Sequence, residues 1–123
     1  MAQSNATASK PNIVIIMTDQ QRADFFRSEG FPLDTMPFVD SLMDRGVRFR
    51  RAYTPMPTCG PARTSMFTGR FPKATRVREN WALREAYYGE DLVDVLRAQG
   101  YSVNLAGKNH SYLRRKDFDF FSP

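Results

Sequence analysis

Long apolar runs and regularly spaced apolar residues alternate along the first half of the chain. Residues 12–17 form a nearly continuous β-branched run, which is typical of a strand buried on both faces of a parallel sheet. Apolar side chains then recur at helical spacing over 36–43, before Gly46, and predict a helix. Residues 47–53 alternate between apolar and polar positions and predict a second strand, which leads into a proline-rich loop at 54–61.

The second half of the chain continues the same order of elements. Residues 90–99 place acidic side chains in the first turn and apolar side chains on one face, which predicts a helix. Residues 101–106 alternate as a third strand would. The order strand, helix, strand, helix, strand is typical of an α/β fold. We therefore expect a mainly parallel central sheet with helices on both faces.

Polar side chains follow the predicted strands. Asp19 comes just after the first strand, Cys59 lies in the loop after the second, and Lys108 and His110 follow the third. Because ligands of such sheets bind beyond the carboxyl ends of the strands, we expect these groups to converge on one edge. Taken singly, each has a structural alternative. A lone cysteine is ordinarily a small buried hydrophobe, a lone histidine is ordinarily structural or exposed, and an aspartate after a strand can be a turn or cap residue.

The composition excludes several classes of protein. With 123 residues, 41% of them hydrophobic and 25% charged, the chain has the size and balance of one globular domain. Its single cysteine excludes an intramolecular disulfide, and its longest apolar run is too short to span a membrane. The formal charge of +5 favours anionic partners, but the basic residues are scattered and no nucleic-acid motif accompanies them. We therefore expect neither a nucleic acid nor a membrane as partner.

The beginning of the chain and one sequon bear on the cellular compartment. Residues 1–10 are polar and small, lack the apolar region of a signal peptide, and are expected to form a disordered leader. Residues 109–111, Asn-His-Ser, fit the N-glycosylation sequon, but a glycan there would obstruct two of the candidate groups. Together these observations predict a bacterial, cytoplasmic setting, with a periplasmic one open if a leader has been removed.

Three motifs together resemble one enzyme family. Residues 59–63, Cys-Gly-Pro-Ala-Arg, with Thr-Gly at 68–69, resemble the signature of the type I sulfatases of the alkaline phosphatase superfamily. Residues 100–110, which run from Gly-Tyr-Ser to Gly-Lys-Asn-His, are similar to the family's second signature. Residues 11–20 are similar to its opening strand and first metal ligand. The motifs stand in the family's order, which implies that residues 11–123 are the N-terminal part of a sulfatase-like catalytic domain.

The resemblance implies a role for each candidate residue. A maturation enzyme would oxidise Cys59 to formylglycine, whose hydrate is the nucleophile that attacks the sulfate ester of a small molecule or carbohydrate. Lys108 would bind a sulfate oxygen and the nucleophile, and His110 would take the proton whose loss expels sulfate. Arg63 is a permanent cation suited to anionic oxygens. It would lie one turn into a helix whose free N–H groups face the same anion.

By the same resemblance, Asp19 and residue 59 are ligands of a divalent metal. The family often has a second aspartate at the next position, where this chain has Gln20, so Gln20 is a candidate neutral ligand. Oxygen ligands suit Ca²⁺, the ion that we favour, or Mg²⁺, and Mn²⁺ stays open.

The resemblance also implies that the site is incomplete. The family's second ligand set, normally Asp followed by Asn or His, has no candidate after residue 110. We expect the remainder of the catalytic domain, or a second chain, to complete the site, and we expect this chain alone to be inactive.

Two alternatives to a sulfatase stay open. The phosphonate monoester and phosphodiester hydrolases of the same superfamily share Cys-Gly-Pro-Ala-Arg and Thr-Asp-Gln but usually lack Gly-Lys-x-His, so Lys108 and His110 favour a sulfatase. The other alternative is a non-catalytic fragment that binds anions or acts as an interaction module. Activity of the complete protein on an aryl sulfate separates the enzyme from the fragment.

Overall fold

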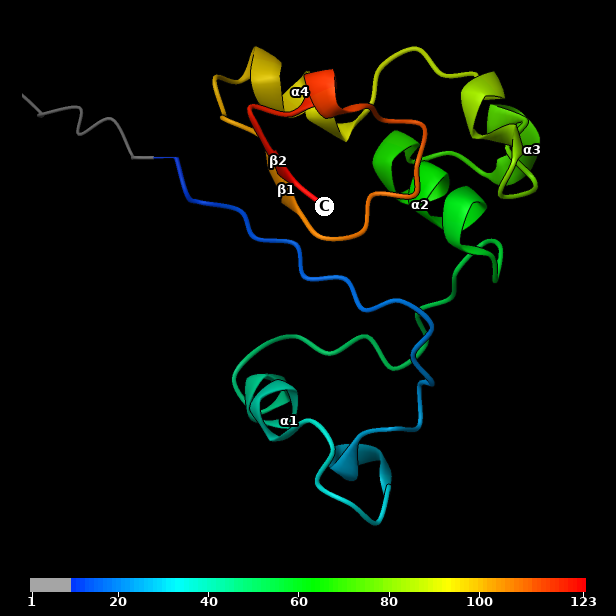
Figure 1. The fold of residues 1–123 in the computed structure, drawn as a ribbon. Coiled ribbons are helices and arrows are strands. Elements are labelled where there is room, and N and C mark those ends of the chain that lie inside the picture. The colour runs from blue at the N-terminus through cyan, green and yellow to red at the C-terminus, as the bar shows by residue number, and fades with distance from the viewer. Residues whose placement is uncertain (1–9) are drawn as a thin grey trace, which may run out of the picture.

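The computed structural model describes residues 10–123, which form short helices, extended segments and one small parallel sheet (Figure 1). The elements form two groups. The larger part holds the sheet and the helices α2 (Cys59–Thr68), α3 (Pro72–Thr75) and α4 (Leu92–Ala98). A separate group holds α1 (Pro37–Met43) and the 3-10 helix η1 (Arg27–Glu29). Two further 3-10 helices are η2 (Ala82–Glu85) and η3 (Arg115–Asp117). The predicted leader lies outside the described residues except for Lys10, whose ammonium donates a hydrogen bond to the carbonyl of Gln99.

Helix α2 begins at Cys59, so the loop predicted over 54–61 ends earlier than expected and Cys59 lies in the helix and not in the loop. Thr58, before the helix, is extended, with φ −118° and ψ 140°. Pro61 lies in the first turn, where its missing N–H would have no partner within the helix. Gly69 ends the helix with φ 64°, in the left-handed region that glycine adopts without strain. The helix buries a face of small and polar residues, Gly60, Pro61, Arg63, Thr64 and Ser65.

The other two predicted helices are also confirmed. Helix α1 starts with Pro37 in its first turn. Helix α4 is capped by Asp91, whose carboxylate accepts hydrogen bonds from the N–H groups of Val93 at 2.8 Å and Asp94 at 3.0 Å. The Asp94 carboxylate in turn accepts from the Asp91 N–H at 3.2 Å, which completes a capping box. These local signals explain why the sequence predicts both helices closely.

The parallel sheet joins two segments near the end of the chain. Strand β1 (Asn104–Ala106) pairs in parallel with β2 (Phe120–Ser122), with Leu105 opposite Phe121. The core lies beside this sheet and consists of Val93, Leu113 and Phe118, against which Phe67 and Tyr112 pack. The predicted strand over 101–106 is therefore confirmed in its second half, and its partner comes from the aromatic end of the chain.

Two predicted strands do not form. Residues 12–17 are extended but have no strand partner within residues 10–123, and Val14 and Ile16 are 80% and 84% exposed. Residues 47–53 likewise form no strand, and Val47, Phe49 and Tyr53 are exposed. The prediction of a broad central sheet is thus confirmed only as a small parallel sheet with helices beside it. The physical reason is that a strand with apolar side chains on both faces needs hydrogen-bonding neighbours and a covering layer over each face.

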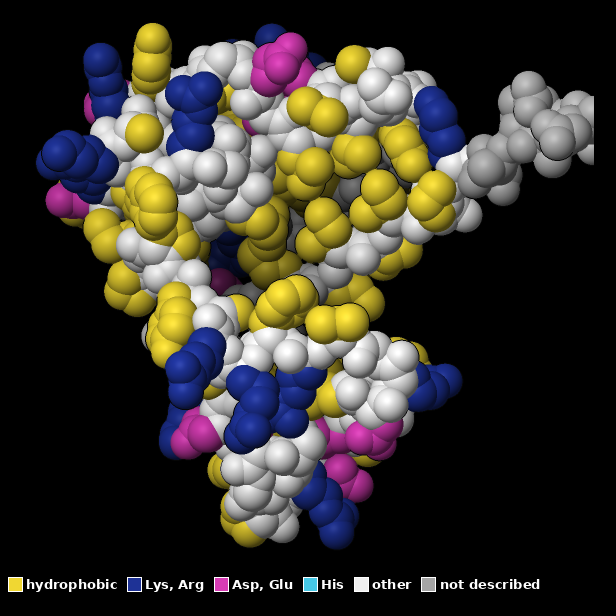
Figure 2. All heavy atoms as spheres, turned by 180° about the vertical axis from the view of Figure 1, so that it is seen from behind, with side chains coloured by type: hydrophobic (Ala, Val, Ile, Leu, Met, Phe, Trp, Pro, Cys, Tyr) yellow, Lys and Arg dark blue, Asp and Glu magenta, His cyan; other side chains and the backbone are white. Residues whose placement is uncertain are grey.

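An apolar hollow lies between residues 12–17 and the rest of the larger part. Figure 2 shows it as a depression lined by hydrophobic side chains, and its volume is about 360 Å³. Ile13, Ile15 and Met17 face it from one side, and Leu105 of β1 faces it from another. The extended segment therefore runs beside β1 without joining the sheet. None of the helices formed by residues 10–123 has the length and hydrophobicity that crossing a membrane requires.

Candidate active site

The structure brings together three side chains from distant parts of the sequence. Asp19 follows the extended segment at 12–17, Cys59 is the first residue of α2, and Lys108 follows β1. The Cys59 thiol donates to Asp19 Oδ1 at 3.4 Å, and the Lys108 ammonium donates to Asp19 Oδ2 at 2.8 Å. The Lys108 Nζ lies 3.8 Å from the Cys59 Sγ. One carboxylate, one thiol and one ammonium thus form a triangle of mutual hydrogen bonds, which we call the Asp19–Cys59–Lys108 cluster.

The charges of the cluster shift one another's proton affinity. The hydrogen bond from Lys108, followed by the one from Cys59, lowers the pKa of the Asp19 carboxyl below its usual value, against a smaller opposing effect of desolvation. The hydrogen bond to Asp19 raises the pKa of the Lys108 amine. At neutral pH the aspartate is therefore ionised and the lysine is protonated.

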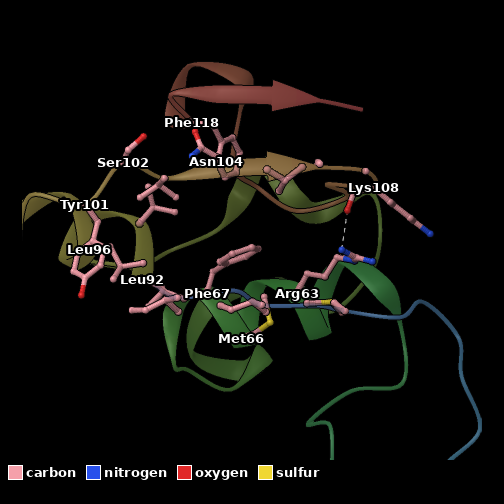
Figure 3. Close-up of a pocket in the computed structure, with 18 of the residues that line it drawn as sticks. Arg63, Met66, Phe67, Leu92, Leu96, Tyr101, Ser102, Asn104, Lys108 and Phe118 are labelled. Atoms are coloured by element: carbon pink, nitrogen blue, oxygen red, sulfur yellow. Dashed lines mark hydrogen bonds between the residues drawn. The ribbon is translucent and has the colours of Figure 1, made fainter. Parts of the chain in front are cut away.

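Arg63 stands behind the cluster, one turn into α2. It is only 8% exposed, and its Nη1 donates a hydrogen bond to the backbone carbonyl of Lys108 at 2.8 Å, which Figure 3 shows as a dashed line. Its Nη2 lies 3.9 Å from Asp19 Oδ1. The planar guanidinium therefore joins the helix of Cys59 to the loop of Lys108 and adds a second cation next to the carboxylate.

The other two predicted site residues lie outside these contacts. Gln20 is exposed, and within residues 10–123 no hydrogen bond joins its side chain to the cluster. His110 is half-buried, and its buried Nδ1 has no hydrogen-bond partner among the described residues. Its backbone has φ 37°, a left-handed conformation that costs energy for a residue with a Cβ. Such strain is typical of positions where the fold holds a side chain for a purpose.

The loop that carries Lys108 and His110 is held by its own hydrogen bonds. The Asn109 amide donates to the Leu113 carbonyl at 2.7 Å and accepts from the Ser111 hydroxyl at 2.6 Å. The Tyr112 hydroxyl donates to the Asp91 carboxylate at 2.7 Å and so ties the loop to the start of α4. Both ends of the Asn109 amide, the acceptor of the sequon, are therefore engaged within the loop.

The metal prediction fits these residues only in part. Asp19 supplies a carboxylate of the kind that hard divalent cations prefer, and residue 59 lies beside it. No group of three or more histidine, cysteine, aspartate or glutamate side chains is placed to hold a metal within residues 10–123. The described residues therefore supply at most part of the ligand set that a metal ion needs.

Sequence reasoning missed one residue next to Cys59. The side-chain oxygen of Asn80 accepts a hydrogen bond from the N–H of Gly60 at 2.9 Å. The two residues are 20 positions apart, and Asn80 lies in an irregular segment with no periodic pattern. No signal in the sequence of one chain links them.

Two members of the cluster, Asp19 and Lys108, line one end of the apolar hollow together with Arg63. Apolar residues of the 12–17 segment, α2, α4 and β1 line most of the remainder. Figure 3 shows Phe67 between α2 and β1 and the Lys108 side chain directed away from the apolar part. The arrangement offers a charged end, which can bind an anion, next to a long apolar wall.

Comparison with known proteins identifies relatives over nearly the whole chain. A family model described as "Sulfatase" matches residues 11–122. Choline-sulfatase of Rhizobium meliloti is 38% identical over 104 residues, which are 85% of this chain and 20% of that protein. Arylsulfatase A of Bos taurus is 35% identical over 119 residues, 89% of this chain and 23% of that protein. An ulvan-active sulfatase of Formosa agariphila is 32% identical over 126 residues, 92% of this chain and 24% of that protein.

The chain thus spans about a fifth to a quarter of the length of the curated relatives that it matches. No solved structure matches the chain significantly.

Proposed function

The chain belongs to the sulfatase family, and from that premise we propose that it carries the nucleophile half of a site that hydrolyses sulfate esters. The observation that carries the proposal is the position of Cys59. It is the first residue of a helix and lies within reach of both Asp19 and Lys108. The matched relatives are named as sulfatases, which favours a sulfate ester over the phosphonate and phosphate esters of related hydrolases. We assign the activity to a complete protein of the relatives' kind, because this chain spans only about a fifth to a quarter of their length.

Residue 59 is the proposed nucleophile, in the formylglycine form that a maturation enzyme would produce from cysteine. The hydrate of formylglycine supplies two hydroxyl groups on one carbon, one to attack sulfur and one whose proton loss expels sulfate. Residue 59 suits this role because it opens α2, where N–H groups without helical partners and the positive end of the helix dipole favour an anion.

Lys108 and Arg63 provide the proposed positive charge for the sulfate group. Asp19 carries one negative charge, and the two cations next to it leave an excess of one positive charge. Lys108 is 46% exposed at its side chain and can reach a bound substrate, whereas Arg63 is buried and fixed by its bond to the Lys108 carbonyl. Lys108 is therefore the proposed substrate contact, and Arg63 holds it in place while contributing to the local field.

His110 is the proposed base that takes a proton from the second hydroxyl of residue 59. An imidazole can accept or release a proton near neutral pH, which suits this role. His110 follows Lys108 by two residues. Its strained backbone, and an Nδ1 that has no hydrogen-bond partner within residues 10–123, support a functional reason for its position. No hydrogen bond within residues 10–123 joins it to Cys59, so the proposal requires His110 to meet the nucleophile in the complete protein.

A divalent metal, which we propose to be Ca²⁺, would be held on this chain by Asp19 and residue 59, with Gln20 as a candidate neutral ligand. When bound, such a cation draws electron density from the nucleophile and from the sulfate oxygens. The lowered pKa of Asp19 keeps its carboxylate ionised and available for this purpose.

The remainder of the catalytic domain is the proposed partner that completes this half-site. Residues 12–17 expose their apolar side chains and have no strand partner within residues 10–123. This supports a complete protein in which the segment is a strand of a central parallel sheet, with a neighbouring strand on each side. The other proposed partners are the maturation enzyme and a small-molecule or carbohydrate sulfate ester. A bacterial cytoplasmic setting remains a proposal of the sequence alone.

The test is sulfate release by the complete protein, produced together with a maturation enzyme. Substrates should include an aryl sulfate, choline sulfate and a sulfated polysaccharide, because the names of the relatives span these classes. An aryl phosphonate monoester and an aryl phosphate diester of the same leaving group serve as the comparison. Preferred hydrolysis of one sulfate ester supports the proposal. Preference for a phosphate or phosphonate ester would replace it with the related hydrolase, and binding without turnover would favour a non-catalytic module.

A further inference from the structure

The N-terminus of α2 is capped from outside the helix. A helix normally has an N-cap side chain that accepts from the N–H of its second or third residue. Thr58 holds the N-cap position but makes no such hydrogen bond. The third residue is Pro61, which has no N–H to offer. Gly60, the second residue, therefore has the one N–H that a cap can take, and the Asn80 side-chain oxygen takes it at 2.9 Å.

Gly60 is the residue that allows this contact. A Cβ at position 60 would lie 3.1 Å from Asn80 Oδ1 and 2.6 Å from Leu83 Cδ2. The second of these distances is closer than Cβ atoms approach in folded proteins, so the end of the Leu83 side chain would have to move. The absence of a side chain at Gly60 thus lets Asn80 and η2 lie directly against the first turn of α2. Tertiary contacts, and not an unusual backbone conformation, therefore explain why a glycine suits the position next to Cys59.

The chemical nature of the cap matters because an anion is expected at the same place. An aspartate would cap equally well and would interact more favourably with the helix dipole. It would also place a negative charge against Gly60, the residue next to Cys59, where a sulfate group must approach. A neutral amide satisfies the Gly60 N–H without opposing the substrate.

We propose that Asn80 is a positioning residue for the nucleophile. By accepting from the Gly60 N–H, it fixes the first turn of α2 and therefore the direction in which residue 59 points toward Asp19 and Lys108. This inference rests on the proposed function for its catalytic consequence, but the cap itself is a property of the fold. Asn80 acts through Gly60 and not through contact with the substrate.

The test compares two substitutions of Asn80 in the complete, matured protein. Asn80→Ala removes the acceptor, so kcat for an aryl sulfate should fall about 10- to 100-fold, since a misplaced nucleophile costs rate, while KM stays within about twofold. Asn80→Asp keeps an oxygen acceptor at the same position, so kcat should stay near that of the wild type. Its added charge should raise KM several-fold at low salt, and this increase should shrink at high salt. Glu79→Ala, an exposed neighbour in the same loop, is the control and should change neither constant.

Hydrogen exchange at the Gly60 amide separates the cap from the activity. The amide should be protected in the wild type and in Asn80→Asp but exchange much faster in Asn80→Ala, whether or not the protein hydrolyses a sulfate ester. An inactive wild type with this pattern would defeat the proposed function while supporting the cap. Unchanged protection in Asn80→Ala would overturn the cap. An equal loss of kcat in Asn80→Asp and Asn80→Ala would overturn the positioning role, because it would mean that the amide nitrogen is the essential group.

Discussion

The Lys108 ammonium lies 2.8 Å from the Asp19 carboxylate, although 89 positions separate the two residues in the sequence. This ion pair joins the end of the extended segment at 12–17 to the end of β1. It is the contact that closes the Asp19–Cys59–Lys108 cluster, because Cys59 lies within reach of both partners. The chemistry proposed for residue 59 uses both partners of this pair, Asp19 for the metal and Lys108 for the sulfate group.

Asp19 should be required for both metal binding and turnover in the complete protein. Asp19→Asn removes the carboxylate that a hard cation prefers and the partner of Lys108. We expect lower metal content by elemental analysis and loss of turnover, with an unchanged circular dichroism spectrum. Asp24→Asn is the matched control, because Asp24 pairs with Arg22 in an exposed ion pair whose loss should have little effect. Full metal content and activity in Asp19→Asn would place the ion elsewhere.

The same pair predicts how stability depends on pH. The pKa of Asp19 is lowered in the folded state, so its contribution is present above the ordinary value of 3.8 and is lost as pH falls through the lower folded value. The pKa of Lys108 is raised, so its contribution is present below 10.5 and is lost as pH rises through the higher folded value.

Denaturant unfolding of the wild type and Asp19→Asn across pH measures this contribution. The difference in free energy of unfolding should be constant in the neutral range, and it should shrink below pH 3.8 and above pH 10.5. A difference that is independent of pH over the whole range would mean that the pair does not form.

Arg63 should not be replaceable by lysine. Its two terminal nitrogens face different partners, the Lys108 carbonyl at 2.8 Å and Asp19 Oδ1 at 3.9 Å. The ammonium of a lysine has one nitrogen and lacks the fixed planar geometry that lets a guanidinium reach both partners. We expect Arg63→Lys to lower kcat about 10- to 100-fold while the charge is kept. Arg70→Lys, at an exposed position close in sequence, should behave as the wild type. Equal kcat for both variants would show that only the charge of Arg63 matters.

Tyr112 should stabilise the loop of Lys108 and His110. Desolvation, followed by the hydrogen bond to Asp91, raises the pKa of Tyr112 well above its usual value, so the hydroxyl keeps its proton and donates at 2.7 Å. Tyr112→Phe leaves the 4% exposed Asp91 without this donor and should cost about 1–3 kcal/mol of the free energy of unfolding. The exposed Tyr87 offers the control Tyr87→Phe, and thermal unfolding compares the two. Equal stability of both variants would contradict the role given to the Tyr112 hydroxyl.

Residues 12–17 should become protected in the complete protein. Their apolar side chains are exposed here, and a strand that is buried on both faces needs neighbours on each side. Hydrogen exchange of the complete protein should place this segment among the slowest, together with residues 104–106. Fast exchange of residues 12–17 would mean that they stay outside any sheet.

The parts of the site that the sequence could predict are those with local signals. The helices of residues 36–43 and 90–99 follow from spacing, proline and capping residues, and the structure contains both. Asp19, Cys59 and Lys108 each follow a predicted strand, and this alone indicates that they meet. These three residues lie together although residues 12–17 and 47–53 form no strand, because the ends of the segments still converge.

Other features could not be predicted because they depend on contacts distant in sequence. Whether the apolar run at 12–17 is buried depends on neighbours that residues 10–123 do not supply. The bond between Asn80 and Gly60 joins two residues with no shared pattern. The role of Arg63 as a link to the Lys108 carbonyl is likewise a tertiary contact, since the sequence indicates only a cation near an anion.

The most direct measurement of the central claim is sulfate release over many turnovers by the complete protein and its Cys59→Ala variant. Mass spectrometry of the peptide that contains residue 59 should first show formylglycine in the wild type. The wild type should then release sulfate from an aryl sulfate in large excess over enzyme. Cys59→Ala should bind the same substrate, with Lys108 and Arg63 intact, and release none. Sustained sulfate release by Cys59→Ala would contradict the account, because the nucleophile would then lie elsewhere.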